Sequence, residues 1–497
     1  MSGRFRIETL GCKANTYDSA LLRQELRRRG WRRAAKGEAA DLVVVNSCTV
    51  TDRADRASRK SAARLARRHP DAIVVMTGCA AETDPEGMAA VDGVRFVVGN
   101  QDKDRLVAEV LAAAAGGADG APADDAPADG APAGEVLGGV RPYARMRSRH
   151  PRARRWPAPA AAFAAPRALG GRTRAFVKIQ EGCDAFCTFC VIPYARGPSR
   201  SLAADAVIEQ VRAVCADGVR EVVLTGTALG DFGVDRPGEL DLEGLIRRIL
   251  ADTALEGLRV GSLDPHELTP GLRDLMVDEP RLRPHAHVSL QSPHPTILKR
   301  MRRRYGVAAV EEALTGLAAL TPRLAARHGV IGGPFVGMDV IVGFPGETEA
   351  IFEASVAALA ALPWTRLHVF PYSERAGTPA TRLDGAVPPA ERKRRVGVLM
   401  ALSNARVLAA AEAIAAAAEP VTVLVEGPAK GLPDGWVQGR TANYHLVAFE
   451  APGGRALKNT SARVRPVCAE ALPRLGSARL RGRLVGGLAE GRLAGAG

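Results

Sequence analysis

Cysteine is scarce in this chain, and neither a long apolar run nor a secretion signal accompanies it. Eight cysteines in 497 residues are far too few for a disulfide-stabilised scaffold. No segment approaches the roughly 18 uninterrupted apolar residues that a membrane span needs. The first residues also lack the charged-then-apolar pattern of a signal peptide. We therefore expect a soluble protein of a reducing cytoplasm, with no membrane partner.

A second absence concerns the segment that holds three of these cysteines. Cys183, Cys187 and Cys190 form a C-x3-C-x2-C triplet, and no fourth cysteine follows nearby. Structural zinc sites usually take four protein ligands, and ferredoxin-type runs supply a further cysteine. Three thiolates can hold three irons of a 4Fe-4S cluster and leave the fourth iron open to a small molecule. The triplet therefore favours chemistry at a cluster over an unrelated zinc loop.

Cys12, Cys48 and Cys79 share a different setting, because each follows a short apolar run typical of a buried parallel strand. Ligands gather at the carboxyl ends of parallel strands, so these thiols are expected to converge at one edge of a sheet. One buried cysteine is commonly a small core residue, but three in equivalent positions favour a second iron-sulfur site. The apolar runs cover residues 5–10, 42–45 and 73–76, with helical patterns over 19–29 and 54–68.

Composition divides the chain into four regions, which predict an α/β multidomain protein. Residues 1–110 form the α/β parallel-sheet domain just described. Residues 111–170 hold Ala-Pro-Ala-Asp repeats and an arginine-rich tract, which predict a disordered basic linker. Residues 171–400 alternate strands with helices as in an open (β/α)6 barrel, with the triplet in the loop after its first strand. Residues 418–481 carry short β segments broken by Gly, Pro and Asn, which predict a small β-barrel. The six barrel strands are expected at 176–179, 222–225, 258–262, 287–290, 338–342 and 366–370.

The chain carries a formal net charge of +14, and its basic residues are clustered. Such clustering indicates a polyanionic partner. In the C-terminal region, aromatic and basic side chains would either hold RNA or divide into a core and a solvated rim. One predicted helix face carries Arg53, Arg56, Lys60, Arg64 and Arg67, and a second basic run spans residues 299–304. The C-terminal set comprises Trp436, Tyr444, Phe449, Lys430, Arg440, Arg463 and Arg465.

Several motifs together resemble the radical-SAM methylthiotransferases, a family whose cysteine triplet uses S-adenosylmethionine (SAM). The resemblance covers about residues 4–468 apart from the linker, and it is closest to the branch that modifies C2 of N6-threonylcarbamoyladenosine beside the tRNA anticodon. The matching segments are Thr9-Leu-Gly-Cys-Lys, Asn46-Ser-Cys-Thr-Val-Thr, Thr77-Gly-Cys79, Ile192-Pro-Tyr-Ala-Arg-Gly197, Leu290-Gln-Ser, Gly343-Phe-Pro-Gly-Glu347, Phe370-Pro-Tyr-Ser373 and Gly377-Thr-Pro379.

The resemblance implies two 4Fe-4S clusters, SAM as cofactor and a C-terminal TRAM domain that binds RNA. The triplet at Cys183 would carry the cluster that cleaves SAM to a 5′-deoxyadenosyl radical. Cys12, Cys48 and Cys79 would carry a second cluster that delivers sulfur. Phe189 would help to place the adenine of SAM, and Gly226 would lie near its methionine end. The implied partners are the anticodon stem-loop of tRNA, a sulfur source, and an electron donor protein such as flavodoxin or ferredoxin.

Three alternatives share parts of this pattern. A sister enzyme could methylthiolate isopentenyladenosine in tRNA or an aspartate of a ribosomal protein, because it would keep both triplets. The segments after Cys48 and around Ala54 favour the threonylcarbamoyladenosine branch. A non-catalytic iron-sulfur protein could instead bind tRNA without cleaving SAM.

Overall fold

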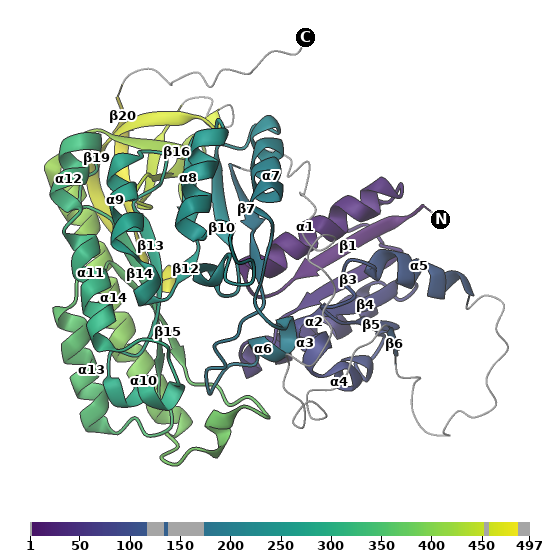
Figure 1. Cartoon of the computed structure of the whole chain (residues 1–497). Helices are drawn as coiled ribbons and strands as arrows, with labels where there is room; N and C mark the ends of the chain where they lie inside the picture. The colour runs from purple at the N-terminus through teal and green to yellow at the C-terminus, as the bar shows by residue number, and fades with distance from the viewer. Residues whose placement is uncertain (1, 117–133, 138–172, 452–456, 486–497) are drawn as a thin grey trace, which may run out of the picture.

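The computed structural model of the chain describes residues 2–116, 134–137, 173–451 and 457–485. An N-terminal α/β domain, a central half-open barrel and a small C-terminal β-barrel follow one another along the chain (Figure 1). The predicted α/β multidomain fold is confirmed. Most of the predicted linker, including its arginine-rich tract, lies outside the described residues.

The N-terminal domain is built on a six-stranded sheet in the order β2-β1-β3-β4-β5-β6, with all strands parallel. Residues 42–45 of its central strand are 0% exposed because helices cover both faces. α1 and α5 pack on one face, and α2, α3 and α4 pack on the other. The strands are β1 Arg4–Thr9, β2 Arg32–Arg33, β3 Leu42–Ser47, β4 Ile73–Gly78, β5 Phe96–Val98 and β6 Glu135–Leu137; the helices are α1 Lys13–Arg28, α2 Asp52–Arg68, α3 Cys79–Thr83, α4 Pro85–Ala89 and α5 Leu106–Gly116.

Strand β6 corrects one expectation about the linker. Residues 111–170 are predicted to form a disordered linker, but α5 continues to Gly116, and Glu135–Leu137 pair in parallel with β5 at the edge of the sheet. Val136 packs against the apolar cluster beneath the sheet. A three-residue strand buries too little apolar surface to stand out from an Ala/Pro-rich sequence, so composition did not reveal it.

The central domain contains seven parallel strands, because the strand predicted at 258–262 is divided into β11 and β12. Strands β7, β10 and β11 form one sheet, and β12 to β15 form a second. The two sheets meet at Gly261, between β11 and β12, where a Cβ atom would lie 2.8 Å from the carbonyl oxygen of Leu224. The strands are β7 Arg174–Lys178, β10 Glu221–Thr225, β11 Gly257–Val260, β12 Ser262–Leu263, β13 His285–Gln291, β14 Phe335–Val342 and β15 Arg366–Pro371, and a short antiparallel pair joins β8 Gln180–Glu181 to β9 Arg200–Ser201.

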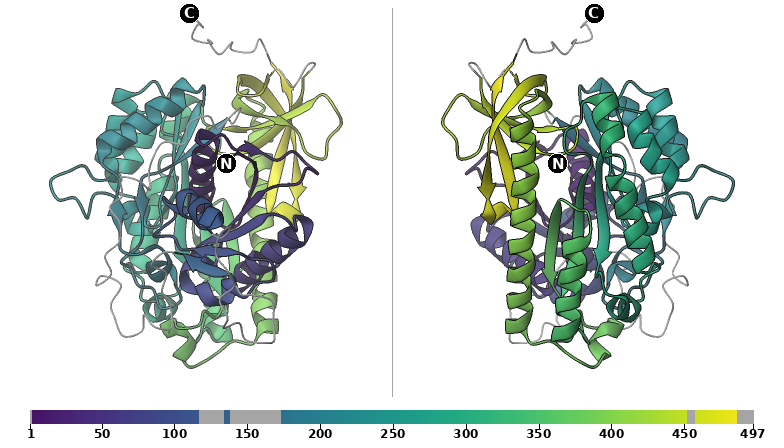
Figure 2. Two further views of the ribbon diagram at one scale, coloured as in Figure 1. Left: turned by 90° about the vertical axis from the view of Figure 1, so that its right-hand side faces the viewer. Right: turned by 90° about the vertical axis from the view of Figure 1, so that its left-hand side faces the viewer.

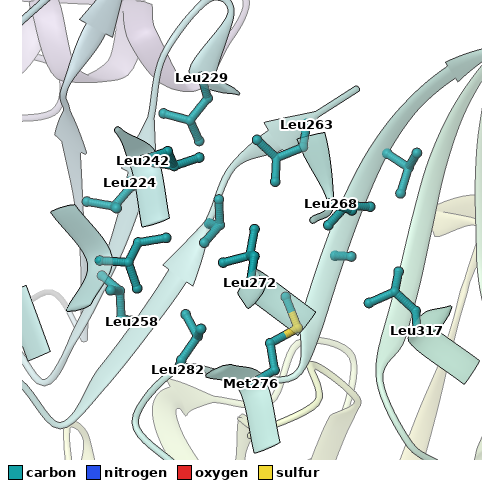
Figure 3. Packing of buried hydrophobic residues seen from close by; sticks show 14 of the residues in the cluster. Leu224, Leu229, Leu242, Leu258, Leu263, Leu268, Leu272, Met276, Leu282 and Leu317 are labelled. Carbon is teal, nitrogen blue, oxygen red and sulfur yellow. The ribbon is translucent and has the colours of Figure 1, made fainter. Parts of the chain in front are cut away.

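Helices cover the outside of these strands and close one continuous apolar core. Figure 3 shows leucines such as Leu224, Leu258 and Leu272 meeting between strands and helices. Cys215 packs against this core. The helices are α6 Ile192–Arg196, α7 Ala204–Ala216, α8 Leu242–Asp252, α9 Pro270–Asp278, α10 Pro295–Met301, α11 Val307–Ala318, α12 Thr321–His328 and α13 Glu349–Ala361, with short 3-10 turns η3 Leu229–Asp231, η4 Pro265–Glu267 and η5 Pro379–Arg382.

The C-terminal domain is a closed five-stranded barrel in the order β16-β17-β18-β20-β19. The long helix α14, Pro389–Ala417, contacts β15 of the central domain and β19 and β20 of the small barrel (Figure 2). It is the one helix in the described part of the chain with the length and hydropathy of a membrane span. The strands are β16 Val421–Pro428, β17 Trp436–Thr441, β18 Leu446–Glu450, β19 Ser461–Leu472 and β20 Ser477–Leu484, with a 3-10 turn η7 Pro473–Leu475.

The predicted aromatic surface of this barrel is only partly present. Phe449 is 0% exposed and belongs to the barrel core, so for this residue the core alternative holds and not the RNA-facing one. Tyr444 faces the central domain, where the Arg259 guanidinium lies 4.9 Å from its ring centre. Arg463 and Arg465 are exposed on β19. The alternation of β strands therefore separates core from rim here, which composition alone did not resolve.

Candidate active site

The cysteine triplet lies in the loop that follows β7 and β8, at the carboxyl end of the first barrel strand. The backbone N–H of Ala185 lies 3.4 Å from the Cys183 sulfur. Nη1 of Arg303 lies 3.0 Å from the Cys187 sulfur and donates a hydrogen bond to it. Both donors favour a negatively charged sulfur and therefore a metal-bound thiolate.

Cys12, Cys48 and Cys79 follow β1, β3 and β4, which are neighbours in the parallel sheet. Gly11 has a φ of +91°, and a Cβ atom there would lie 2.7 Å from the Cys48 sulfur. Only glycine therefore permits this close approach of two strand-end loops. The side chain of Asn100 lies 3.6 Å from the Cys79 sulfur. The three cysteines thus follow the carboxyl ends of adjacent parallel strands, as the sequence predicts.

One cavity of about 470 Å³ has thiols from both groups in its wall. Cys12 enters it from the N-terminal domain, and the triplet enters it from the central domain. Cys48 and Cys79 are buried behind Cys12 and are not part of the wall. Further wall residues are Thr51, Phe189, Asp264, Asp339, Ile341 and Phe370.

The electrostatics of the thiols suit ligands that ionise only on binding metal. Burial, and next the nearby Cys79, raise the pKa of Cys48 to about 12. Burial raises the pKa of Cys183 to about 11 and also raises the pKa of Cys190. A bound cation would be needed to keep such thiols deprotonated at neutral pH.

The described side chains are not arranged as ligands of a single metal ion. Among the residues that the structure describes, no three His, Cys, Asp or Glu side chains could hold one ion together. In a 4Fe-4S cluster each thiolate binds a different iron, so the ligands stand farther apart. The triplet lines an open cavity, with N–H donors beside two of its sulfurs. Iron ligation by the six cysteines stays a prediction.

A carboxylate pair lies beside the triplet and was not identified from the sequence. Arg303 forms an ion pair with Asp264, so it connects this wall of the cavity to Cys187. Oε2 of Glu267 accepts a hydrogen bond of 2.8 Å from the backbone N–H of Asp264. Burial, and next the charge of Asp264, raise the pKa of Glu267 to about 7. No sequence pattern identifies this pair, because a Pro-His-Glu turn has no distinctive spacing.

Phe189 and Gly226, which were expected to contact SAM, lie in different positions relative to the cavity. Phe189 is part of the cavity wall, and its ring meets that of Phe344 edge-on with centres 6.2 Å apart. Gly226 is not part of the wall, and a Cβ atom there would lie 2.8 Å from Oε1 of Gln180. The same oxygen accepts 2.9 Å hydrogen bonds from the backbone N–H groups of Thr227 and Ala228. These next two residues do line the cavity, so Gly226 shapes the loop behind it.

A buried charge network, absent from the sequence prediction, fixes Cys12 relative to the triplet. Asp18 of α1 is 3% exposed and accepts a hydrogen bond of 2.7 Å from Nζ of Lys178 in β7. Arg196, just after the triplet, donates to Oδ1 of Asn15 over 2.5 Å and also pairs with Glu181. The network crosses from the first turns of α1, next to Cys12, into the central domain.

The two predicted basic clusters differ in how many of their side chains form ion pairs. On α2, Arg53, Lys60 and Arg67 are exposed and form no ion pair with any described residue, whereas Arg56 pairs with Asp52. The Thr51 side chain caps α2 and lines the cavity, so this basic face starts at the cavity edge. The expectation of a second free basic patch at residues 299–304 is wrong for most of it. Ion pairs engage Arg300, Arg303 and Arg304 with Asp384, Asp264 and Asp231.

Two family models match the chain, one in each of its first two domains. The model described as uncharacterized protein family UPF0004 matches residues 4–99. The model of the radical SAM superfamily matches residues 177–359. The first match contains Cys12, Cys48 and Cys79, and the second contains the triplet.

Individual relatives match most of the chain. The threonylcarbamoyladenosine tRNA methylthiotransferase MtaB of Bacillus subtilis is 34% identical over 399 residues, which cover 80% of this chain and 79% of that protein. The protein of the same name from Aquifex aeolicus is 34% identical over 80% of this chain and 87% of its own length. Among solved structures, the radical SAM methyltransferase TsrM of Kitasatospora setae gives a TM-score of 0.49 at 17% identity, covering 75% of this chain and 72% of that one.

Proposed function

The chain belongs to the family of radical-SAM tRNA methylthiotransferases, and we propose that it inserts a methylthio group at C2 of N6-threonylcarbamoyladenosine 37 in the tRNA anticodon stem-loop. The substrate is inferred from relatives that are 34% identical over 80% of the chain and whose names contain threonylcarbamoyladenosine. Membership of the family makes the chain an enzyme with SAM and a 4Fe-4S cluster.

The observation that carries the proposal is the shared cavity. Cys12 and the triplet line the same space of about 470 Å³ from two different domains. The C2–H bond of a purine has no acidic proton, so general acid–base catalysis offers no route to substitution there. A carbon radical and a sulfur donor must both reach the same atom. One cavity bounded by two cysteine groups supplies that arrangement.

Each cysteine group would hold one cofactor set. Cys183, Cys187 and Cys190 would hold the cluster that binds SAM, and Cys12, Cys48 and Cys79 would hold the second cluster. When bound, these groups supply the radical and the sulfur that amino-acid side chains lack.

Side chains of this protein shape the cavity and exclude water from it. Phe189, Ile341 and Phe370 line the cavity with apolar surface, which excludes water from a reactive carbon. Gln180 fixes the backbone of Thr227 and Ala228 in the wall. Arg303 orients Cys187 through a hydrogen bond of 3.0 Å.

The proposal includes the partners that this reaction needs. The basic face of α2 and the exposed Arg463 and Arg465 of the small barrel would contact tRNA phosphates. A cytoplasmic electron donor such as flavodoxin or ferredoxin and a separate sulfur source would complete the cycle.

Analysis of tRNA nucleosides tests the proposal. A strain that lacks the gene should accumulate N6-threonylcarbamoyladenosine and lose its 2-methylthio derivative, as measured by mass spectrometry of digested tRNA. Purified enzyme with SAM, a low-potential reductant and a sulfur source should restore the modification. Loss of a methylthio group from isopentenyladenosine or from a ribosomal-protein aspartate instead would show that the substrate is wrong and keep the reaction class.

A further inference from the structure

The loop of the cysteine triplet has a second face, which lies away from the cavity. Thr188, the residue after Cys187, is 3% exposed and does not line the cavity. Its backbone N–H donates a hydrogen bond of 3.1 Å to the carbonyl oxygen of Met301, and its hydroxyl donates one of 2.9 Å to that of Arg300. Its own carbonyl oxygen accepts a hydrogen bond of 2.8 Å from the backbone N–H of Ala380. The end of α10 and the turn η5 therefore lie directly against the triplet.

Arg300 fixes these two segments to each other. Its guanidinium pairs with Asp384, just after η5, and its Nε donates a hydrogen bond of 2.9 Å to the carbonyl oxygen of Pro345. A Cβ atom at Gly346 would lie 2.7 Å from that Nε, so glycine leaves room for the guanidinium. The backbone N–H of Gly346 also donates a hydrogen bond of 2.7 Å to the carbonyl oxygen of Gly385. The surface beside the triplet is thus held in one shape.

Three exposed cations lie on these two segments. Lys299 belongs to the last turn of α10, Arg302 is the C-cap residue of that helix, and Arg382 ends η5. None of the three side chains forms an ion pair or a hydrogen bond with a residue in the described part of the chain. The neighbouring carboxylate of Asp384 is already paired with Arg300. The surface therefore carries three uncompensated positive charges, which favour a negatively charged partner.

Arg302 has a backbone conformation that an arginine adopts at a cost. It ends α10 with φ +55° and ψ +47°, in the left-handed region where glycine is preferred. A cation at a helix C-terminus is favourable, but Lys299 already supplies one in the last turn. A long charged side chain at a position that favours glycine therefore indicates a role for its charge beyond the contacts of the chain itself.

The proposed reaction requires an electron to reach the triplet while the cavity is filled. SAM and the target base would occupy the cavity, so an electron donor has to approach the triplet from another face. Electron transfer becomes steeply slower with distance, so that face has to lie directly behind the cysteines. The side of Thr188 meets both requirements, because Thr188 binds two segments whose outer side chains are in solvent.

The same surface lies away from the domain that would bind RNA. Figure 1 shows β16, β19 and β20 of the C-terminal barrel at the top of the molecule and α10 near the bottom. A tRNA held by the small barrel and a protein bound beside α10 would therefore use different ends of the molecule.

We propose that Lys299, Arg302 and Arg382 form the docking surface for an acidic one-electron carrier protein that reduces the cluster held by the triplet. The inference rests on the proposed function, for which it assigns the face that the electron donor uses. In this step one electron leaves the reduced carrier, which is oxidised, and enters the cluster, which is reduced. No bond forms or breaks, and no proton is transferred.

Reduction of the cluster by an acidic flavodoxin tests the surface. The reconstituted holoenzyme is mixed anaerobically with reduced flavodoxin, and the second-order rate constant is measured by stopped-flow absorbance. Calorimetric titration with oxidised flavodoxin gives the Kd separately. Changing Lys299, Arg302 and Arg382 together to glutamine should weaken binding and lower the rate constant at low salt by about tenfold or more, because electrostatic steering accelerates association to this extent. The difference from the wild type should disappear at high salt, where exposed charges are screened.

Two further variants separate docking from folding. Exchanging lysine for arginine and arginine for lysine at all three positions should keep the wild-type rate, because the charges remain. Changing Arg27, Arg33 and Lys36 to glutamine removes three charges from exposed positions of the N-terminal domain and should also leave the rate unchanged. Dithionite needs no docking surface, so it should drive SAM cleavage equally in every variant. Iron content shows that each variant holds its clusters.

The outcomes separate this inference from the proposed function. The inference is overturned if the triple glutamine variant accepts electrons from flavodoxin at the wild-type rate, or if flavodoxin cannot reduce the wild-type cluster. It is also overturned if the variant loses affinity for tRNA in place of flavodoxin, or loses dithionite-driven cleavage to the same extent. If flavodoxin reduces the cluster through this surface but no methylthiolated nucleoside forms, the proposed function fails and the docking surface stands.

Discussion

Nη1 of Arg303 lies 3.0 Å from the sulfur of Cys187, while the same guanidinium pairs with Asp264 in the cavity wall. The arginine comes from the turn after α10, more than a hundred residues beyond the triplet in the chain. It therefore couples a prospective cluster ligand to a carboxylate in the cavity wall. The coupling gives the first of four predictions.

Replacing Arg303 with glutamine should make the reduction potential of the triplet's cluster more negative. The guanidinium favours the more negatively charged, reduced state, and its loss should shift the potential by on the order of 60 mV, the value of one charge-assisted hydrogen bond. EPR-monitored redox titration measures the shift. Arg300→Gln is the matched control because Arg300 contacts Pro345 and Asp384 and no cysteine. An unchanged potential would show that Arg303 serves packing alone.

The two cysteine groups should be separable by mutation. Changing Cys12, Cys48 and Cys79 together to alanine should remove about half of the roughly eight irons expected for two four-iron clusters and keep reductive SAM cleavage. Changing Cys183, Cys187 and Cys190 together should abolish cleavage. Iron assay and detection of 5′-deoxyadenosine give the answer, and cleavage that survives the second change would refute the assignment.

The exposed basic face of α2 should contribute to tRNA binding. Arg53, Lys60 and Arg67 have no counterion among the described residues, so tRNA phosphates can take that role. Changing all three to glutamine should reduce the slope of log Kd against log salt by about 2 to 3, because each lost phosphate contact removes roughly 0.9. Arg327→Gln is the control, since Arg327 already pairs with Asp278. Equal slopes would exclude α2 from the interface.

Protonation of Glu221 at acid pH should weaken the contact between the central and C-terminal domains. Burial alone would raise its pKa, but Arg259 and Arg174 lower it from 4.5 to about 2. Because the folded pKa is depressed, the stabilisation is fully present above pH 4.5 and is lost as the pH falls toward 2.

The Glu221→Gln variant tests this contribution of Glu221 to stability. It should lose about 3 kcal/mol of unfolding free energy at neutral pH because the buried arginines lose their partner. It should also depend less on pH below 4.5 than the wild type does. Urea unfolding followed by circular dichroism measures both effects, and parallel pH curves for the two proteins would contradict the prediction.

Sequence patterns predicted the elements that bury continuous apolar runs. The strand at residues 42–45 was identified because its apolar side chains are buried on both faces, and this also located Cys48 beyond the strand end. Phe449 was misassigned because a short strand with mixed residues does not reveal which face is buried. The edge strand β6 was missed because its three residues lie in a low-complexity segment.

Charge patterns were less reliable than apolar patterns. The run at residues 299–304 resembled a nucleic-acid patch, but Arg303 points at a cysteine and Arg304 pairs with Asp231. The network of Asp18, Lys178 and Arg196 joins residues more than 150 positions apart. Local spacing cannot reveal such pairs, because they depend on how two domains meet.

That network also limits how the first two domains can be exchanged. Asp18 lies in one matched family segment, whereas Lys178, Glu181 and Arg196 lie in the other. Without Asp18 at the interface, Lys178 and Arg196 would share the single carboxylate of Glu181. A chimera that takes its N-terminal domain from a distant relative must therefore bring a compatible set of these residues, so the two modules are constrained to change together.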